Sequence, residues 1–442
     1  MSASNLYRRI FTKKHLRELY FSSVRFRAAV GVDKINRRAF ENNIDENIDI
    51  IYRKVRNGAY KFTPYREKLI SRGSKKLPRV VSIPTIRDKL TLKALYEVLQ
   101  ATYQNQTPFV HRIINKVSMV LGAKEYDGVS RLDVKDFYPS IDHLLLLKQI
   151  KKRIRKHELL MLIANSIKQP TVVKIKKGEI RPNDIGIPQG LSISNILANT
   201  YLFTIDEKYS NRGSLKYFRY VDDILILCKC NEIDPIRSEI DSDCKKIKLI
   251  IHSDDPEKST SCSISDGFTY LGYVFKNEKI SIRKKSVEYL RESILKLFTN
   301  YKYSESHELT LLKWSVDLRI TGCVFNETKY GWLFFFSQIN DLELLNSLDH
   351  FIKKLIARFG IEPANITFKK FVRAYHEITK HLSHTKYIPN YDKYTVSDKR
   401  NILSDIFGLK TQILTSADIE YQFNRRIYQT VRDLEKDLAR AS

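Results

Sequence analysis

The sequence predicts a folded α+β protein, because helical and extended patterns alternate along it. Apolar residues recur at helical spacing through residues 1 to about 60 and through 88–103. Residues 61–84, 130–133 and 215–228 instead have the patterns typical of strands. Hydrophobic residues make up 43% of the 442-residue chain, which is enough to bury a large core and argues against a disordered protein.

The net charge is the strongest compositional signal. The chain has 77 Lys and Arg residues against 50 Asp and Glu residues, which gives a formal charge of +27. A surface this basic attracts polyanions, and nucleic acid is the leading candidate. Solubility alone does not require so large an excess of one sign. We therefore expect a nucleic-acid partner.

Cysteine spacing and hydropathy argue against several other classes of protein. The five cysteines contain no C-x-x-C pair, so the sequence predicts neither a zinc site nor a disulfide framework. Cys228 and Cys230 alternate along an expected strand, which predicts that both are core residues on one face. The N-terminal segment lacks the apolar core of a signal peptide, and the apolar runs are too short to span a bilayer. We expect a cytoplasmic protein without a membrane partner.

Local patterns give a coarse organisation for the rest of the chain. Val172 to Arg181 is expected to form a hairpin, and residues 191–202 are expected to form a helix. A shift toward helical patterns near residue 285 is the predicted division point. The aromatic run from Trp332 to Phe336 is expected to be core rather than a surface for stacking bases.

Tyr220-Val221-Asp222-Asp223 is the most informative short segment. Two apolar runs flank the aspartate pair, which predicts a tight β-hairpin with both carboxylates at its tip. Adjacent carboxylates repel each other unless a cation neutralises them, so the pair suggests a divalent-metal site. Aspartate is also a common turn residue, and a purely structural turn is the alternative.

Asp133 is the expected partner of this pair. Phosphoryl transfer to a growing nucleic acid uses two divalent ions about 4 Å apart, held by carboxylates from separate segments. Asp133 ends a short strand and lies in the segment LDVKDFYPSID. Asp136 and Asp142 compete for this role, but a solvated turn and a helix cap are the simpler interpretations of these two residues.

Four segments, in this order, resemble the palm motifs of reverse transcriptases: LDVKDFYPSID, GIPQGLSISNILAN, YVDD and YLGY. Upstream, GVDKINRRAFENNI and NGAYKFTPYR resemble the amino-terminal region of group II intron, retron and related bacterial enzymes. RVVSIPTIRDKLTLKAL resembles their finger motif. The resemblance covers about residues 30–275, and the ordered set is far more specific than any single motif.

The resemblance implies a right-hand polymerase fold. Fingers and palm would occupy residues 1–285, a helical thumb 286–360, and a C-terminal helical region 361–442. It also implies an RNA-directed DNA polymerase that adds dNTPs to a DNA product on an RNA template, with two Mg²⁺ ions, or Mn²⁺, in its site. The sequence leaves open whether the template is a dedicated non-coding RNA. It also leaves open whether a partner protein or a second copy of the chain takes part.

The catalytic residues of the family map onto matching positions of this chain. By resemblance, Asp133 and Asp222 would ligate both metals, and Asp223 would support the second metal or shape the turn. Lys258, in the segment IIHSDDPEKST, would protonate the leaving pyrophosphate as a general acid.

Nucleotide recognition is implied in the same way. Tyr138 would lie under the sugar of the incoming nucleotide, where its ring would exclude a 2′-hydroxyl. Gln189 and Gly190 match a Pro-Gln-Gly turn that contacts the incoming nucleotide and the template. Here Ser194-Asn195 replaces the usual Ser-Pro pair, and Asn195 is expected to cap the helix that follows.

Two further sites are implied for the triphosphate and the primer. Arg79, with Lys75 or Lys76 nearby, fits the finger cations that hold the triphosphate. The turn Tyr270-Leu271-Gly272-Tyr273 matches the primer grip, where Gly272 permits close approach of the backbone.

The branch of the family is less sharply defined. DVKDFYPSID and residues 319–339 resemble bacterial enzymes of the abortive-infection and antiphage-defence groups. Ile320-Thr321-Gly322 resembles the Val-Thr-Gly triplet of retron enzymes, so a retron-type enzyme stays open. Untemplated or protein-primed DNA synthesis by the same site, and an inactive RNA-binding scaffold, are the remaining alternatives.

Overall fold

The computed structural model describes residues 2–26, 29–71, 77–104, 110–174, 181–252, 259–304 and 308–439. The chain forms two compact units. Unit 1 consists of Met1–Pro108 and Tyr126–Ser263, and unit 2 of Phe109–Glu125 and Ile264–Ser442. These two units do not test the predicted boundaries of the palm, thumb and C-terminal region, so the boundaries at residues 285 and 360 stay predictions.

Helices form much of unit 1, and several of them begin at a side-chain cap. Asp142 accepts a hydrogen bond of 2.9 Å from the backbone N–H of Leu145, and Thr85 accepts one of 3.1 Å from that of Asp88. The α-helices described in unit 1 are α1 (Ala3–Ile10), α2 (Lys13–Leu19), α3 (Arg37–Asn42), α4 (Ile44–Arg56), α5 (Ile86–Tyr103), α7 (Phe137–Ser140), α8 (His143–Lys151), α9 (His157–Lys168), α10 (Ser194–Tyr201), α11 (Phe203–Ser210) and α12 (Ile233–Lys246).

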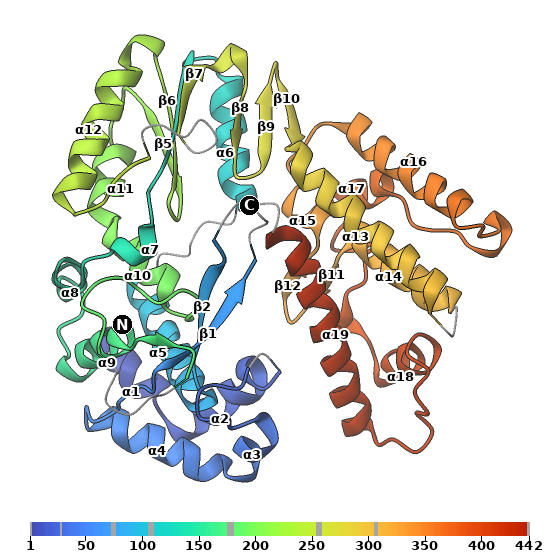
Figure 1. Cartoon of the computed structure of the whole chain (residues 1–442), viewed down its shortest axis with the longest axis horizontal. Helices are drawn as coiled ribbons and strands as arrows, with labels where there is room; N and C mark the ends of the chain where they lie inside the picture. The colour runs from blue at the N-terminus through green and yellow to red at the C-terminus, as the bar shows by residue number, and fades with distance from the viewer. Residues whose placement is uncertain are drawn as a thin grey trace. The chain divides into compact units, whose positions relative to one another are not determined.

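In unit 1, a four-stranded antiparallel sheet (Figure 1) and the turn between two of its strands carry the predicted site residues Asp133, Asp222 and Asp223. Its strands are β3 (Gly128–Asp133), β5 (Lys216–Tyr220), β6 (Asp223–Cys228) and β7 (Thr260–Ser263), in the order β5-β6-β3-β7. α11 packs against β5, and α12 packs against β3. Residues 224–228 of the inner strand β6 are fully buried, which fixes the register of the sheet by hydrophobic burial.

A second, smaller sheet carries the basic finger segment. It contains β1 (Tyr65–Ile70), β2 (Arg79–Ile83) and β4 (Thr171–Val172), in the order β2-β1-β4. β1 pairs antiparallel with β2 and parallel with β4. The hydroxyls of Ser82 and Thr171 share a 2.7 Å hydrogen bond across this sheet.

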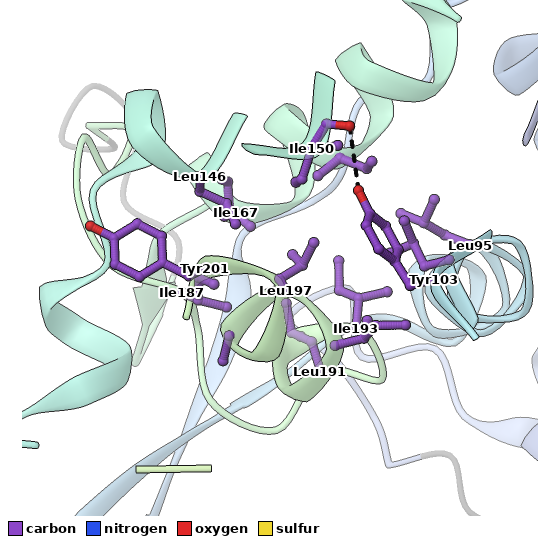
Figure 2. Close-up of a cluster of buried hydrophobic side chains, with 14 of the residues drawn as sticks. Leu95, Tyr103, Leu146, Ile150, Ile167, Ile187, Leu191, Ile193, Leu197 and Tyr201 are labelled. Atoms are coloured by element: carbon purple, nitrogen blue, oxygen red, sulfur yellow. Dashed lines mark hydrogen bonds between the residues drawn. The ribbon is translucent and has the colours of Figure 1, made fainter. Parts of the chain in front are cut away.

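Residues of α10 and of the loop before it belong to the core of unit 1 (Figure 2). Leu197 of α10, together with Leu191 and Ile193 just before this helix, lies in one cluster with Leu95 of α5 and Ile150 of α8. The Tyr103 hydroxyl donates to the Ile150 carbonyl at 3.4 Å, which satisfies a polar group inside this apolar cluster. Because the loop that precedes α10 is anchored in this core, the Pro-Gln-Gly turn has a rigid base.

Unit 2 is mainly helical, with two small antiparallel sheets. One sheet has the order β10-β9-β8, and the other pairs β11 with β12. The described elements of unit 2 are α6 (Val110–Gly122), β8 (Phe268–Tyr270), β9 (Tyr273–Lys276), β10 (Lys279–Ile282), α13 (Lys284–Tyr303), α14 (Leu309–Thr321), β11 (Cys323–Phe325), β12 (Thr328–Tyr330), α15 (Trp332–Phe335), α16 (Leu342–Arg358), α17 (Phe371–Lys380), α18 (Val396–Asp405) and α19 (Ser416–Ala439).

The aromatic run of unit 2 is core, as predicted. The Trp332 ring lies 5.0 Å from the Phe336 ring and 6.4 Å from the Phe371 ring, measured between centroids. The preceding Ile320-Thr321-Gly322 triplet forms a tight junction between α14 and β11. Gly322 has a φ of 64°, and a Cβ there would lie 2.1 Å from the Tyr330 carbonyl oxygen.

The predicted secondary structure is confirmed in outline and corrected in detail. The helical N-terminal region, the extended segment 61–84 and the hairpin around the aspartate pair are present. The expected core position of Cys230 is wrong: Cys228 is buried but Cys230 is exposed, because β6 ends at Cys228 and a 3-10 turn begins. The hairpin expected at Val172 to Arg181 falls largely on residues 175–180, outside the described residues.

Among the described residues, no helix combines the length and the apolar composition that are needed to cross a bilayer.

A buried tyrosine–aspartate pair stabilises the finger region and gives a test of the fold. Asp88 accepts hydrogen bonds from the Tyr60 hydroxyl at 2.8 Å and from the Thr63 N–H at 3.0 Å. We expect Asp88→Ala to reduce the free energy of unfolding by about 2–4 kcal/mol, because it leaves the buried Tyr60 hydroxyl and the partly buried Thr63 N–H without their acceptor. Tyr60→Phe removes a donor instead, and about 1 kcal/mol is expected. Urea denaturation followed by circular dichroism measures both, and equal losses would contradict this account.

Candidate active site

The register between β3 and β6 brings the predicted aspartates together. Asp133 lies directly opposite Asp223 in this antiparallel pair, so their side chains share one face. Asp222 occupies the turn between β5 and β6, and its carbonyl accepts a 3.2 Å hydrogen bond from the Val134 N–H. The backbone around all three aspartates is therefore fixed at one end of the sheet.

A buried arginine holds the turn that presents Asp222. Val221 has a φ of 58°, an unfavourable conformation for a β-branched residue. Arg219 donates to the Val221 carbonyl at 2.7 Å and to the Asn199 side chain at 3.0 Å, and it also pairs with both carboxylate oxygens of Asp206. Its side chain is only 8% exposed. We infer that these contacts offset the strain at Val221.

Arg219 is not among the site residues predicted from the sequence. A charged residue inside the apolar run that leads into the aspartate pair was the available signal, since a buried arginine needs partners.

The two adjacent aspartates have different electrostatic environments. Arg131 grips Asp223 with two hydrogen bonds, from Nε at 2.8 Å and from Nη2 at 2.9 Å. Burial raises the pKa of Asp222, and the neighbouring charge of Asp223 raises this pKa further. Within the described residues, no ion pair or side-chain hydrogen bond to Asp222 is found. Arg131 thus pairs with Asp223, whereas Arg79 and Arg219 lower the pKa of Asp222 through their charge without pairing with it among the described residues.

The donor chemistry fits a hard divalent cation. Asp133 and Asp222 provide carboxylate oxygens, the ligands that Mg²⁺ prefers. His252 Nε2 lies 3.6 Å from Asp133 Oδ2, and the His252 N–H donates to the Asp133 carbonyl at 2.9 Å. No group of three or more His, Cys, Asp or Glu in the described ranges is gathered as a metal site. Arg131 donates hydrogen bonds to both oxygens of Asp223, which is consistent with the absence of such a group among these residues.

The Pro-Gln-Gly turn is tied to the finger strand β2. The Gln189 side-chain oxygen accepts a hydrogen bond from Arg79 Nε, and the Gln189 carbonyl accepts one of 2.7 Å from the Ser82 N–H. Gly190 has a φ of 98°, and a Cβ there would lie 2.6 Å from Val81 Cγ1. Glycine is therefore required for this close approach. The structure brings Arg79, Gln189 and Gly190 together.

Tyr138 lies deep beside this turn. It is 8% exposed, and its hydroxyl donates to the side-chain oxygen of Asn195. Burial raises the pKa of Tyr138, and the charge of Asp222 raises it further. The predicted cap at Asn195 is wrong. α10 begins at Ser194, so Asn195 already lies in the first turn and its side chain contacts Tyr138 instead.

The YLGY segment forms a tight turn in unit 2. Leu271 and Gly272 have φ values of 49° and 84°, and the Gly272 carbonyl accepts a 2.9 Å hydrogen bond from the Arg283 N–H. Tyr270 and Tyr273 are fully buried, and the Tyr273 hydroxyl donates to the Phe335 carbonyl at 2.5 Å. The tyrosines are therefore core residues, and Leu271 and Gly272 are the more accessible part of the turn.

The remaining predicted residues divide into two groups. Asp136 is an exposed turn residue with a φ of 46°, and Asp142 caps α8, as the structural interpretations of both expected. Lys258, Lys75 and Lys76 lie outside the described residues.

Comparison with known proteins identifies the family of this site. Residues 70–275 match the family described as reverse transcriptase (RNA-dependent DNA polymerase). The chain contains a reverse transcriptase domain. This domain spans the finger strands β2 and β4, the four-stranded sheet and the YLGY turn, and it confirms the predicted right-hand polymerase fold. The chain is accordingly classed as an RNA-directed DNA polymerase, which is a nucleotidyltransferase.

Two curated relatives share this domain. Protein YkfC of Escherichia coli (strain K12) is 24% identical over 341 residues, which cover 66% of this chain and 85% of that protein. The group II intron-encoded protein LtrA of Lactococcus lactis subsp. cremoris is 26% identical over 175 residues, which cover 37% of this chain. The match spans only 28% of the length of LtrA.

Solved structures of telomerase show a weaker likeness. Apo telomerase from Candida tropicalis has a TM-score of 0.43 at 13% identity, over 93% of this chain and 87% of that chain. Telomerase from Candida albicans in complex with a TWJ fragment of telomeric RNA has a TM-score of 0.42 at 12% identity, over 90% and 63%. The assignment to the family does not depend on these scores.

Arg219 provides a test of how the turn is held. We expect Arg219→Met to slow dNTP incorporation by about 10–100-fold, because a misplaced Asp222 loses the geometry that catalysis needs. Single-turnover primer extension measures this rate. Arg212→Met is the matched control. Arg212 lies just before β5 and pairs with Glu239 of α12, and it does not contact the turn. A folded Arg219→Met variant with the wild-type rate would show that the turn holds itself.

Proposed function

We propose that this protein copies an RNA template into DNA, with Asp133 and Asp222 as the metal-holding carboxylates. The observation that carries the proposal is the unequal environment of the aspartate pair. Arg131 neutralises Asp223, while the half-buried Asp222 lies beside that charge and forms no ion pair within the described ranges of the chain. A carboxylate kept in this state is suited to a cation that binds with the substrate.

The bound Mg²⁺ ions would stabilise the attacking and leaving oxygens during nucleotidyl transfer. The residues of the chain would hold and orient the reactants. Asp133 and Asp222 would bind the ions, and Asp223, fixed by Arg131, would shape the turn. Arg79 is presented beside Gln189 for the triphosphate, and the Tyr138 ring restricts the space for a 2′-hydroxyl. The proposed roles of Lys258 as general acid and of the Tyr270–Tyr273 turn as primer grip rest on the sequence resemblance.

The first experiment measures dNTP incorporation by the purified protein with its co-purifying RNA. Asp133→Asn and Asp222→Asn should each lower the rate at least about 10³-fold, because each removes a metal-binding charge. Asp136→Asn is the matched control, since Asp136 is an exposed aspartate of the same segment. Wild-type activity in the Asp222→Asn variant would contradict the assigned site. Removal of Mg²⁺ with EDTA should abolish synthesis in every variant.

Treatment with RNase before the assay separates the modes of synthesis. Loss of DNA synthesis in the RNase arm supports RNA-templated polymerisation. Synthesis that survives RNase but not Asp222→Asn supports untemplated extension. A product that stays with the protein until proteinase digestion supports protein priming. Bound RNA without synthesis by the wild type supports an inactive scaffold.

We further propose a role in bacterial antiphage defence. Its support is the resemblance of DVKDFYPSID and of residues 319–339 to the abortive-infection and defence-associated enzymes. Expression in phage-challenged bacteria should reduce the number of plaques, and Asp222→Asn should restore it to that of cells with an empty vector. Equal protection by the wild type and the variant would exclude a role for polymerisation. A short DNA joined covalently to RNA in these cells would favour the retron-type alternative.

A further inference from the structure

Unit 2 contains a basic cavity beside α17. Its volume is 420 Å³, and its lining residues are Lys369, Arg373, Glu377, Thr385, Lys386 and Tyr387. α17 contributes two of these residues, and the segments before and after it contribute the other four. Three cationic side chains thus face one carboxylate. None of them belongs to the reverse transcriptase match at residues 70–275.

Tyr387 is the fixed centre of the cavity. Its hydroxyl accepts a 2.7 Å hydrogen bond from the Lys370 N–H, and its carbonyl accepts one of 2.6 Å from Lys369 Nζ. Its own N–H donates to Thr385 Oγ1 at 3.0 Å. These bonds attach the loop at 385–387 to the segment where α17 begins, so the lining is preorganised rather than formed by independent surface side chains.

Arg373 is positioned but still accessible. Its guanidinium lies 4.5 Å from the centre of the Tyr387 ring, and its Nε lies 3.7 Å from Glu377 Oε1. The side chain is nevertheless 66% exposed, and Lys386 is also exposed. Stacking on the ring restrains the guanidinium, while its outer N–H groups can reach a ligand. Such a fork matches the geometry of a phosphate.

Residues 369–386 include five Lys and Arg residues and one acidic residue, Glu377. Asp317 and Asp349 also lie near Tyr387, but their carboxylates accept the backbone N–H groups of Lys369 and Phe371. Burial lowers the pKa of Lys369, a tendency that a nearby anion would oppose. Pockets for small molecules are mostly apolar and enclosed. A cavity with exposed cations on its rim better fits the backbone of a polyanion.

We propose that this cavity is a phosphate-binding site for the backbone of single-stranded RNA. Arg373 supplies the forked donor, and Lys369 and Lys386 supply point charges. The proposal rests on the proposed function only in its choice of RNA as the polyanion. It assigns a binding role to the C-terminal helical region, 361–442.

The test measures RNA affinity of the full chain without catalysis. A fluorescein-labelled single-stranded RNA of about 20 nucleotides is titrated in EDTA, without dNTPs, over a NaCl series. At physiological salt, Arg373→Gln combined with Lys386→Gln should weaken binding about 5–10-fold. The slope of log affinity against log salt should fall by about 1.4, because two phosphate contacts are lost. Arg373→Lys should lose about 2–3-fold, since it keeps the charge but not the fork.

A control with the same change of charge keeps the test specific. Lys354→Gln combined with Arg358→Gln neutralises one exposed lysine and one exposed arginine on α16 of the same unit. Less than about 2-fold loss is expected there. Equal losses in both double variants would reduce the effect to net charge and overturn the proposal. So would unchanged affinity in the cavity variant.

Two further arms separate the causes of a failure. Single-stranded DNA of the same sequence should lose affinity by a similar factor, because the phosphates are shared; a loss confined to RNA would overturn phosphate recognition. RNA bound through the cavity without dNTP incorporation by the wild type would contradict the proposed function alone. Normal incorporation with unchanged RNA affinity in the cavity variant would contradict the present inference alone.

Discussion

The antiparallel register between β3 and β6 is the constraint on which the candidate active site depends. It sets Asp133 opposite Asp223 and leaves Asp222 in the adjoining turn. A slip of one residue would move alternate side chains to the other face of the sheet. The run 224–228 is buried on both faces and is bounded by Asp223 and Lys229, so a slip would move one of these charged residues into the place of a buried apolar residue. The geometry of the carboxylates is therefore maintained by hydrophobic burial behind them.

Two arginines hold different parts of the segment that contains the adjacent aspartates. Arg131 satisfies both oxygens of Asp223, and Arg219 fixes the strained turn at Val221 from the other side. Both guanidiniums are largely buried, where a hydrogen-bonded ion pair is retained for geometry more than for net stability. This arrangement leaves the Asp222 carboxylate without a close ion-pair partner among the described residues. The polymerase site is thus an electrostatic arrangement built into a rigid sheet.

The contacts around Tyr138 show how a departure from the family pattern is accommodated. The Ser-Pro pair that the family usually has is Ser194-Asn195 here, and the additional amide oxygen accepts the Tyr138 hydroxyl. Ser194 Oγ meanwhile donates to the Pro188 carbonyl at 2.7 Å, which ties the start of α10 to the Pro-Gln-Gly turn. Asn195 therefore adds a polar contact at the Tyr138 hydroxyl, and α10 begins at Ser194.

The sequence by itself determined the local elements and the chemistry of the site. Its patterns predicted the hairpin at the aspartate pair, the strand that ends at Asp133 and the cap at Asp142, because periodicity and capping are local properties. Tertiary structure alone decided the partners of those residues. Arg131 and Asp223, which are hydrogen-bonded, lie 92 residues apart in the sequence, and Tyr138 and Asn195 lie 57 residues apart. The cavity around Tyr387 depends on a chain reversal after α17. Such contacts arise from packing between distant segments, and no local pattern in the sequence encodes them.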